Sequence, residues 1–258
     1  MKKLAFMFIA LVAILSVSAC RIEKVNNNEP AKSFTLNFKD FQSIKNFSNC
    51  DIHFTQSNTY KVVLKATPQW YNAHTITANN GELVITEKEE KKQKGITVLK
   101  FNNISSGAEL WISAPNISSV AMGGSGDLYA ESDISGQYFH LSIAGSGDSR
   151  LKNIRLTDDF SYSVSGSGDV ETGIILAKNA SFSISGSGDI KSKLANVENT
   201  KLTIAGSGDG SLSFDQCGSA VIGIAGSGDI NLSGTLQSLD KRVSGSGDIN
   251  TSKLQLGK

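Results

Sequence analysis

A four-residue motif, Gly-Ser-Gly-Asp, occurs seven times between residues 124 and 248, and it constrains the fold more than any other feature. Its aspartates follow one another at intervals of 19 to 21 residues, from Asp127 to Asp248. The residues that we expect to form seven equivalent turns are Gly124, Gly126, Asp127, Gly145, Gly147, Asp148, Gly166, Gly168, Asp169, Gly186, Gly188, Asp189, Gly206, Gly208, Asp209, Gly226, Gly228, Asp229, Gly245, Gly247 and Asp248. Such regularity predicts a stack of equal structural units.

The residues around each motif alternate between apolar and polar. Phe182-Ser183-Ile184 and Leu202-Thr203-Ile204 lead into two of the motifs, and this period of two is typical of a half-buried strand. An apolar residue directly follows the aspartate in five of the seven copies, and the exceptions are Ser149 and Gly210. We therefore expect one strand before each motif and a second strand after it.

These features predict an all-β fold, a right-handed parallel β-solenoid (β-helix) with coils of about 20 residues. One coil cannot bury its apolar face alone, whereas stacked coils pair through their backbones and form a continuous core. Right-handed coiling is the usual choice for parallel connections. The blades of a β-propeller need about 40 to 50 residues, and the leucine-rich repeat pattern is missing.

Each residue of the motif suits a tight turn. The glycines allow a sharp bend with positive φ, the serine is small enough to stack on its own copies, and the aspartate can accept hydrogen bonds from backbone N–H groups in the turn.

The sequence divides into four segments. We expect a lipoprotein signal peptide at residues 1–19, a flexible tether at 20–32, an N-terminal β region at 33–122 and the repeat solenoid at 123–258. The region 33–122 lacks the motif but is rich in strand-like alternation, so it should cap or extend the solenoid. At the other end, Lys241-Arg242 interrupts the apolar pattern and is expected to begin a polar cap, which discourages stacking of further chains.

The first twenty residues have the pattern of a secretion signal. Lys2 and Lys3 precede an apolar run at residues 4–17, which is too short for a permanent membrane span. Val17-Ser18-Ala19-Cys20 resembles the bacterial lipobox, so Cys20 is the predicted lipidation site. The alternative is ordinary cleavage nearby, with Cys20 incidental. The lipobox predicts a protein of the bacterial cell envelope, held to the lipid bilayer through acylated Cys20, at the outer membrane on its periplasmic or surface face.

Composition argues against a nucleic-acid partner. The 258 residues include 25 Lys and Arg and 24 Asp and Glu, so the chain has no basic excess to neutralise phosphates.

Few residues suggest chemistry. Asp158 and Asp159 are adjacent rather than paired across a groove, and His53, His74 and His140 lack the spacing of a zinc site. The repeated aspartates could bind calcium, but one carboxylate per coil supplies few of the six to eight oxygens that calcium prefers. A turn-forming role is the stronger interpretation. We predict no catalytic residue, no metal and no cofactor.

Binding is the remaining possibility. Trp70-Tyr71, Trp111 and Tyr138-Phe139-His140 are the candidate aromatic contacts for a glycan or protein ligand, although core packing explains them better. The Gly-Ser-Gly strip could also support self-association. Cys50 and Cys217 lie in unlike contexts and are expected to be small buried side chains rather than a disulfide.

Four short segments carry a resemblance to a known family. Residues 38–44, 51–56, 81–85 and 114–117, followed by the repeated motif, resemble the putative auto-transporter adhesin head GIN domain, a family common in lipoproteins of Bacteroidetes. The resemblance implies a β-helical fold and a cell-envelope location, and it implies no reaction.

Together these features predict a membrane-anchored lipoprotein that acts as a non-enzymatic structural or adhesin-like module. The alternative is a carbohydrate-active β-helix enzyme, which would need a groove where polar residues that break the repeat converge.

Overall fold

The computed structural model of the protein describes residues 29–88 and 107–257. The predicted signal peptide, Cys20 and the first part of the tether lie outside the described residues. The first eleven elements are β1 (Lys32–Leu36), β2 (Ser43–Phe47), β3 (Asp51–Gln56), β4 (Lys61–Ala66), α1 (Pro68–Ala73), β5 (His74–Asn79), β6 (Glu82–Glu87), β7 (Glu109–Ala114), β8 (Ser119–Met122), β9 (Leu128–Ala130) and β10 (Ile134–Gly136). The remaining strands are β11 (Phe139–Gly145), β12 (Ser149–Leu151), β13 (Ile154–Leu156), β14 (Asp159–Gly166), β15 (Val170–Leu176), β16 (Asn179–Gly186), β17 (Ile190–Ala195), β18 (Asn199–Gly206), β19 (Gly210–Gly226), β20 (Ile230–Gly245) and β21 (Ile249–Leu256).

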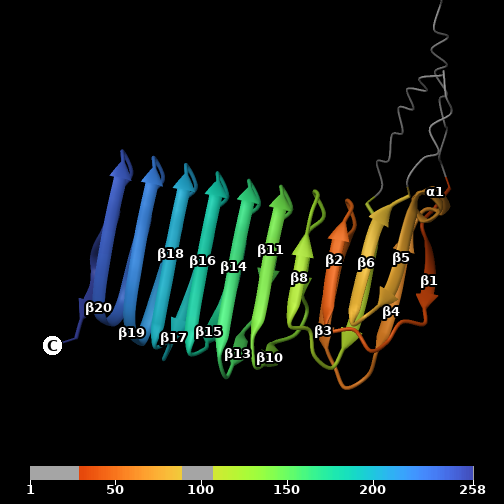
Figure 1. The fold of residues 1–258 in the computed structure, drawn as a ribbon, viewed down its shortest axis with the longest axis horizontal. Coiled ribbons are helices and arrows are strands. Elements are labelled where there is room, and N and C mark those ends of the chain that lie inside the picture. Colours follow the sequence, from red (N-terminus) through yellow and green to blue (C-terminus); the bar gives the residue numbers. More distant parts are fainter. Residues whose placement is uncertain (1–28, 89–106, 258) are drawn as a thin grey trace, which may run out of the picture. The chain divides into compact units, whose positions relative to one another are not determined.

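Each coil of the repeat places one strand before its Gly-Ser-Gly-Asp corner and one after it. The strands before the corners pair in parallel and form face A, which consists of β6, β2, β8, β11, β14, β16, β18 and the C-terminal parts of β19 and β20. The strands after the corners form face B, which consists of β7, β3, β9, β12, β15, β17, the N-terminal parts of β19 and β20, and β21. Figure 1 shows the coils in a row. The prediction of an all-β solenoid with about seven turns of roughly 20 residues is confirmed.

The register keeps equivalent residues of successive coils above one another. Gly166 pairs with Gly145 on one side and with Gly186 on the other, and the same register continues through Gly206 and Gly226. The corners therefore lie in a single file along the stack.

The core is a set of apolar columns between the two faces. In β16, Phe182 and Ile184 are buried while their neighbours Ser183 and Ser185 are exposed, as the alternating sequence predicts. Burying each such side chain contributes about 1.5–3 kcal/mol. Ser149 and Gly210, the two residues after a motif aspartate that are not apolar, are also buried. They therefore occupy the same inward position as the apolar residues of the other coils.

The N-terminal region contributes coils of its own, in an order that differs from the chain order. Strand β2 lies between β6 and β8, and β3 lies between β7 and β9. Beyond them, β5 pairs antiparallel with β6, β4 with β7, and β1 with β4. The region thus both extends the solenoid and closes its end.

Helix α1 belongs to this closure and was not predicted from the sequence. The Thr67 side chain accepts a hydrogen bond from the backbone N–H of Trp70, and Pro68 occupies the first turn, as is common at helix starts. Six residues are too few to show a helical period. The helix places Trp70 in the core, where its ring stacks on His74 at 3.8 Å and its Nε1–H donates to the Asn49 side chain at 2.8 Å.

Near the C-terminal end, a lysine occupies a position that is apolar and buried in the preceding coil. Lys241 pairs in register with Ile222, yet Lys241 is exposed because β20 is the last strand of face A among the described residues. Its neighbour Arg242 pairs with Asp240 at 2.7 Å. A lysine in place of an apolar side chain discourages another coil from stacking here.

Candidate functional site

The aspartates of the corners form a continuous hydrogen-bonded ladder. The backbone N–H of Asp209 donates to Oδ1 of Asp189 in the preceding coil at 2.7 Å. Every successive pair of motif aspartates forms this bond, at 2.7 to 3.0 Å. The ladder also extends one step further than the motif, because Asp51 accepts from the N–H of Asp127 at 2.9 Å. The carboxylates therefore bond to the next coil's backbone, whereas the sequence suggested a partner within the same turn.

The glycines are needed because neighbouring corners are very close. A Cβ on Gly206 would lie 2.0 Å from the carbonyl oxygen of Gly186, and Gly206 has a φ of +142°. The N–H of Ser207 donates to that same oxygen at 2.9 Å. The corner is thus a closely packed structural joint, and its small residues follow from that packing.

The structure does not bring the predicted titratable candidates together. His53 lies on face B, His74 is buried beside Trp70, and His140 is exposed on face A. Asp158 accepts a hydrogen bond from the Gln137 side chain and Asp159 from the Asn179 side chain, both at 2.8 Å. Within residues 29–88 and 107–257, no three His, Cys, Asp or Glu side chains are grouped closely enough to hold a metal ion.

The candidate aromatic residues divide into core and surface. Trp70 and Phe139 are fully buried, so core packing explains them. Tyr71 is 40% exposed but stacks on Phe34, with 4.4 Å between ring centroids. Tyr138 and Trp111 are 50% and 42% exposed.

Trp111 begins a row of stacked side chains on face B. The centroids of the Trp111 and His53 rings are 3.9 Å apart, and the two ring planes are nearly parallel. His53 in turn stacks on Tyr129, with 4.9 Å between ring centroids. The guanidinium of Arg150 then lies 5.6 Å from the centre of the Tyr129 ring. These four residues come from β7, β3, β9 and β12, which are neighbours in face B. We call them the aromatic row.

Polar contacts hold the aromatic row in place. His53 Nδ1 lies 2.8 Å from a carboxylate oxygen of Glu131. The Trp111 indole N–H donates to Glu109 at 3.1 Å, and this bond, with further help from Lys65, lowers the pKa of Glu109. Carboxylates that accept hydrogen bonds favour their charged form.

Tyr129 is fixed in the same way. Its hydroxyl donates to Oδ2 of Asp127 at 2.8 Å, and this bond raises the pKa of Tyr129 more than its partial burial does. The row is therefore tied directly to the aspartate ladder, since Oδ1 of Asp127 accepts from Asp148.

A groove of about 330 Å³ lies beside Trp111, and we call it the Trp111 groove. It is lined by His53, Thr55, Lys61, Val63, Trp111, Ile112 and Ser113. These residues come from three adjacent strands, because β7 lies between β3 and β4.

A second groove, of about 350 Å³, runs beside the aspartate ladder over five coils. Its walls include the carboxylates of Asp148, Asp169, Glu171, Asp189 and Asp209. The two cations in it are already near acids, since Arg150 lies 3.6 Å from Asp148 and Lys191 lies 2.7 Å from Glu171.

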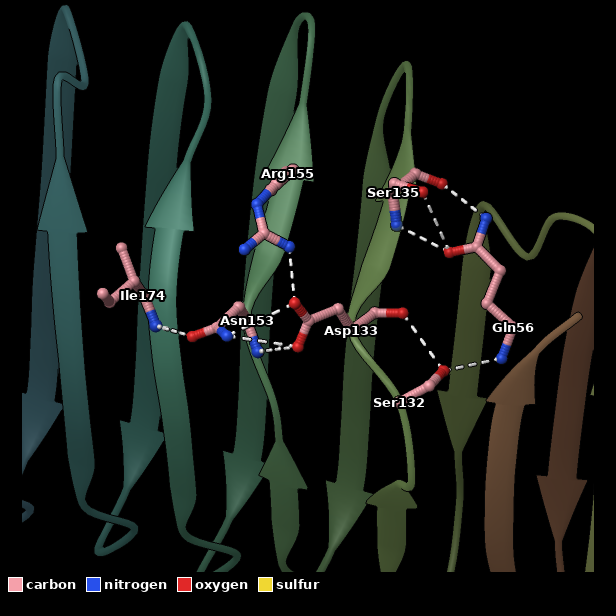
Figure 2. A network of polar contacts seen from close by, with 7 residues as sticks. All are labelled: Gln56, Ser132, Asp133, Ser135, Asn153, Arg155 and Ile174. Atoms are coloured by element: carbon pink, nitrogen blue, oxygen red, sulfur yellow. Dashed lines mark hydrogen bonds and ion pairs between the residues drawn. The ribbon is translucent and has the colours of Figure 1, made fainter.

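Polar side chains also bridge the coils at the end of face B opposite the Gly-Ser-Gly-Asp corners (Figure 2), where they bond to backbone and to one another. Gln56 accepts from the N–H of Ser135 at 2.6 Å and donates to its carbonyl at 2.8 Å. The Asn153 side chain donates to Asp133 at 3.2 Å and accepts from the N–H of Ile174 at 3.0 Å. Asp133 also forms an ion pair with Arg155, so the network satisfies backbone groups and pairs its own charges, and it offers no separate site.

Sequence reasoning missed the aromatic row, although a signal was present. In Asp51-Ile52-His53 and in Asp127-Leu128-Tyr129, an aromatic residue stands two positions after a corner aspartate. The later coils have charged residues at this position, namely Arg150, Glu171 and Lys191. Extending the repeat to Asp51 would have placed the rings next to one another.

Comparisons with known proteins agree with this fold. The sequence matches the family described as "Putative auto-transporter adhesin, head GIN domain" over residues 40–216 and 195–258. A comparison with curated proteins finds no match. Within the part of the chain that the structure describes, no helix is both long and apolar enough to cross a membrane.

Several solved structures share the fold at low sequence identity. One is a putative adhesin from Bacteroides fragilis NCTC 9343, with 17% identity, a TM-score of 0.72, and coverage of 90% of this chain and 100% of that chain. A putative adhesin from Parabacteroides distasonis ATCC 8503 has 17% identity and a TM-score of 0.65, covering 86% and 97%. A protein described as a putative lipid binding protein from Parabacteroides distasonis ATCC 8503 has 20% identity and a TM-score of 0.63, covering 88% and 99%.

Proposed function

The chain belongs to the "Putative auto-transporter adhesin, head GIN domain" family, and on that premise we propose that it is an adhesin-like module of the bacterial cell envelope. In this proposal the solenoid is a rigid, non-enzymatic support that presents a binding surface on face B. The observation that carries the proposal is the aromatic row, in which Trp111, His53 and Tyr129 break the polar repeat and lie together at the surface. Exposed aromatic side chains on a rigid sheet are well suited to binding, because little conformational freedom is lost when a ligand docks.

The state of the nearby acids favours binding over hydrolysis of a carbohydrate. Glycoside hydrolysis uses two carboxyl groups that face the reacting bond. Here Glu131 is paired with His53, Glu109 bonds to Trp111 and Lys65, and both oxygens of Asp127 are engaged. These contacts support a non-enzymatic role. Incubating the protein with polysaccharides and measuring released reducing ends tests this, and release above background would contradict it.

We further propose that the protein is anchored by lipid at Cys20, which follows the signal peptide 1–19, at the outer membrane. The polar segment after Cys20 would connect the anchor to β1, which begins at Lys32. Cys20→Ala should move the protein from the membrane fraction to the soluble fraction. Unchanged fractionation would contradict the lipid anchor while leaving the adhesin-like role open to the binding test.

Binding itself is tested with the purified chain from residue 21 onwards. The protein should bind a glycan or a protein on immobilised bacterial or host surfaces, and cells that display it should adhere more than cells that lack it. Equal adhesion by both kinds of cell, together with no binding by the purified chain, would overturn the adhesin-like function.

A further inference from the structure

We propose that the Trp111 groove binds an acidic sugar residue, one that carries a carboxylate or sulfate group, of a surface glycan. This inference rests on the proposed adhesin-like function and names the ligand class of its site. Three properties of the groove support this ligand: an uncovered aromatic face, a cation that has no ion-pair partner among the described residues, and nearby hydroxyl groups.

The aromatic face is provided by the indole of Trp111. One side of this ring is covered by His53 at 3.9 Å, and on the other side the residue in register is Val63. A valine side chain is much smaller than an indole, so the outer part of this second face is open, in agreement with the 42% exposure of Trp111. The C–H groups on one side of a sugar ring pack well on such a surface, because they are apolar and the face of an aromatic ring is electron-rich.

The charge of the groove favours an anion. Lys61 is exposed at its edge, and it forms no ion pair with the described residues. None of the seven lining residues is acidic, and the two carboxylates next to the groove already have partners, Glu109 in Lys65 and Glu131 in His53. A carboxylate or sulfate on the ligand would therefore supply an ion-pair partner, which Lys61 does not have among the described residues.

Hydroxyl groups complete the polar side of the groove. Thr55 and Ser113 pair with each other in register between β3 and β7, and Lys61 pairs with Ser113 from the other side. The three side chains therefore form one polar column next to the column of His53, Trp111 and Val63. A sugar has an apolar face and a polar rim, and this arrangement of one apolar and one polar column matches both.

The groove beside the aspartate ladder does not fit the same ligand. Its lining includes five acidic side chains, and its two cations already lie close to two of them. An anionic sugar would be repelled there, so the two grooves differ in the charge of the ligand they accept.

The test measures binding of glucuronate-terminated and 6-sulfoglucose-terminated oligosaccharides, with glucose-terminated counterparts for comparison, to the purified chain from residue 21 onwards. We expect the acidic sugars to bind more tightly than glucose. Trp111→Ala should weaken binding of every sugar about tenfold or more, and Lys61→Gln should weaken only the acidic ones, by about fivefold. Tyr138→Ala and Lys201→Gln, which change an exposed aromatic residue and an exposed lysine outside the groove, should bind as the wild type does.

Different failures have different meanings. Equal binding of glucose and the acidic sugars that Lys61→Gln does not change would overturn the acidic ligand. Binding that both groove variants retain in full would overturn the groove as the site, although the adhesin-like function would stand. If the chain binds no sugar but still adheres through a protein, the inference fails and the proposed function survives. Lys61→Gln alters only an exposed side chain, so it remains informative even if Trp111→Ala unfolds.

Discussion

Gly186 lies directly over the carbonyl oxygen of Gly166 in the preceding coil, and a Cβ on Gly186 would stand only 2.0 Å from that oxygen. This separation is far below any permitted contact, so the stack can keep its register only if this position has no side chain. Gly186 also has a φ of +142°, a conformation that residues with a Cβ rarely adopt. Two independent requirements therefore select glycine at this corner.

Gly186→Ala should destabilise the protein by about 3 kcal/mol or more, because both backbone strain and the clash with Gly166 must be relieved. Unfolding in urea, followed by circular dichroism, measures this loss. Gly223→Ala is the matched control: it lies in β19, and its added Cβ would have only one neighbour, at 4.0 Å. If the two variants were equally stable, close packing at the corner would not be the reason for its glycines.

The coil and its corner were predictable because both repeat. The interval between the motifs sets the length of a coil, and the alternation around Phe182 and Ile184 indicates which side chains point inward. The order of the N-terminal coils was not predictable in this way. Strand β2 lies between β6 and β8, so the coil that contains β2 comes earlier in the sequence than the coil that contains β6, although it lies further along the stack. No local sequence pattern indicates this arrangement.

The candidate site was harder to predict than the fold, since a binding surface is where the repeat is broken. The sequence showed Trp111 as a candidate aromatic contact. Its exposure, however, depends on its neighbours His53 and Val63, which lie on β3 and β4 and come next to Trp111 only when these strands pair with β7. The aspartate ladder shows the same limit. Its residues follow from the motif, whereas its bonds run between coils and its first member, Asp51, lies outside any Gly-Ser-Gly-Asp copy.

Asp189→Ala should reduce the free energy of unfolding by about 1 kcal/mol, because the N–H of Asp209 loses its acceptor. Asp189→Asn keeps an oxygen in the same place and removes a charge from the row of carboxylates, so it should be more stable than the alanine variant. Urea denaturation of the two variants measures the difference. Equal stability of the two variants, or a less stable asparagine variant, would mean that the side-chain oxygen does not stabilise the protein as an acceptor for the next coil.

Removing divalent cations should leave the melting temperature unchanged. The motif aspartates each use Oδ1 to accept a backbone N–H, from Asp127 to Asp229, and one carboxylate per coil gives calcium too few ligands. Calorimetry with EDTA and with added calcium checks this expectation. A fall of several degrees in EDTA, restored by calcium, would show that cations hold the corners together.

The thiols of Cys50 and Cys217 should be unreactive in the folded protein. Both are buried and neither forms a disulfide, and burial raises the pKa of each thiol, with the Asp51 carboxylate adding to the effect at Cys50. Since the thiolate is the reactive form, a thiol reagent should modify the purified chain from residue 21 onwards only when denaturant is present. Rapid reaction of either thiol under native conditions would indicate that its coil opens readily.

Acid should loosen the aromatic row through Glu109. The hydrogen bond from Trp111 and the nearby Lys65 lower the pKa of Glu109 in the folded chain below its ordinary value of 4.5. Ionised Glu109 therefore stabilises the folded state fully above pH 4.5, and this contribution is lost as the pH falls through the lowered folded-state value. The carboxylate is partly exposed, so we expect its contribution at neutral pH to be only about 0.5 kcal/mol.

Glu109→Gln isolates this contribution. The variant should be slightly less stable than the wild type at neutral pH, and the difference should disappear in acid, where Glu109 of the wild type is also uncharged. The fluorescence of Trp111, recorded in a Trp70→Phe background, should follow the same titration, because Glu109 accepts from its indole N–H at 3.1 Å. A stability difference that stays constant from neutral to acid pH would mean that Glu109 acts through packing or a neutral hydrogen bond, not through its charge.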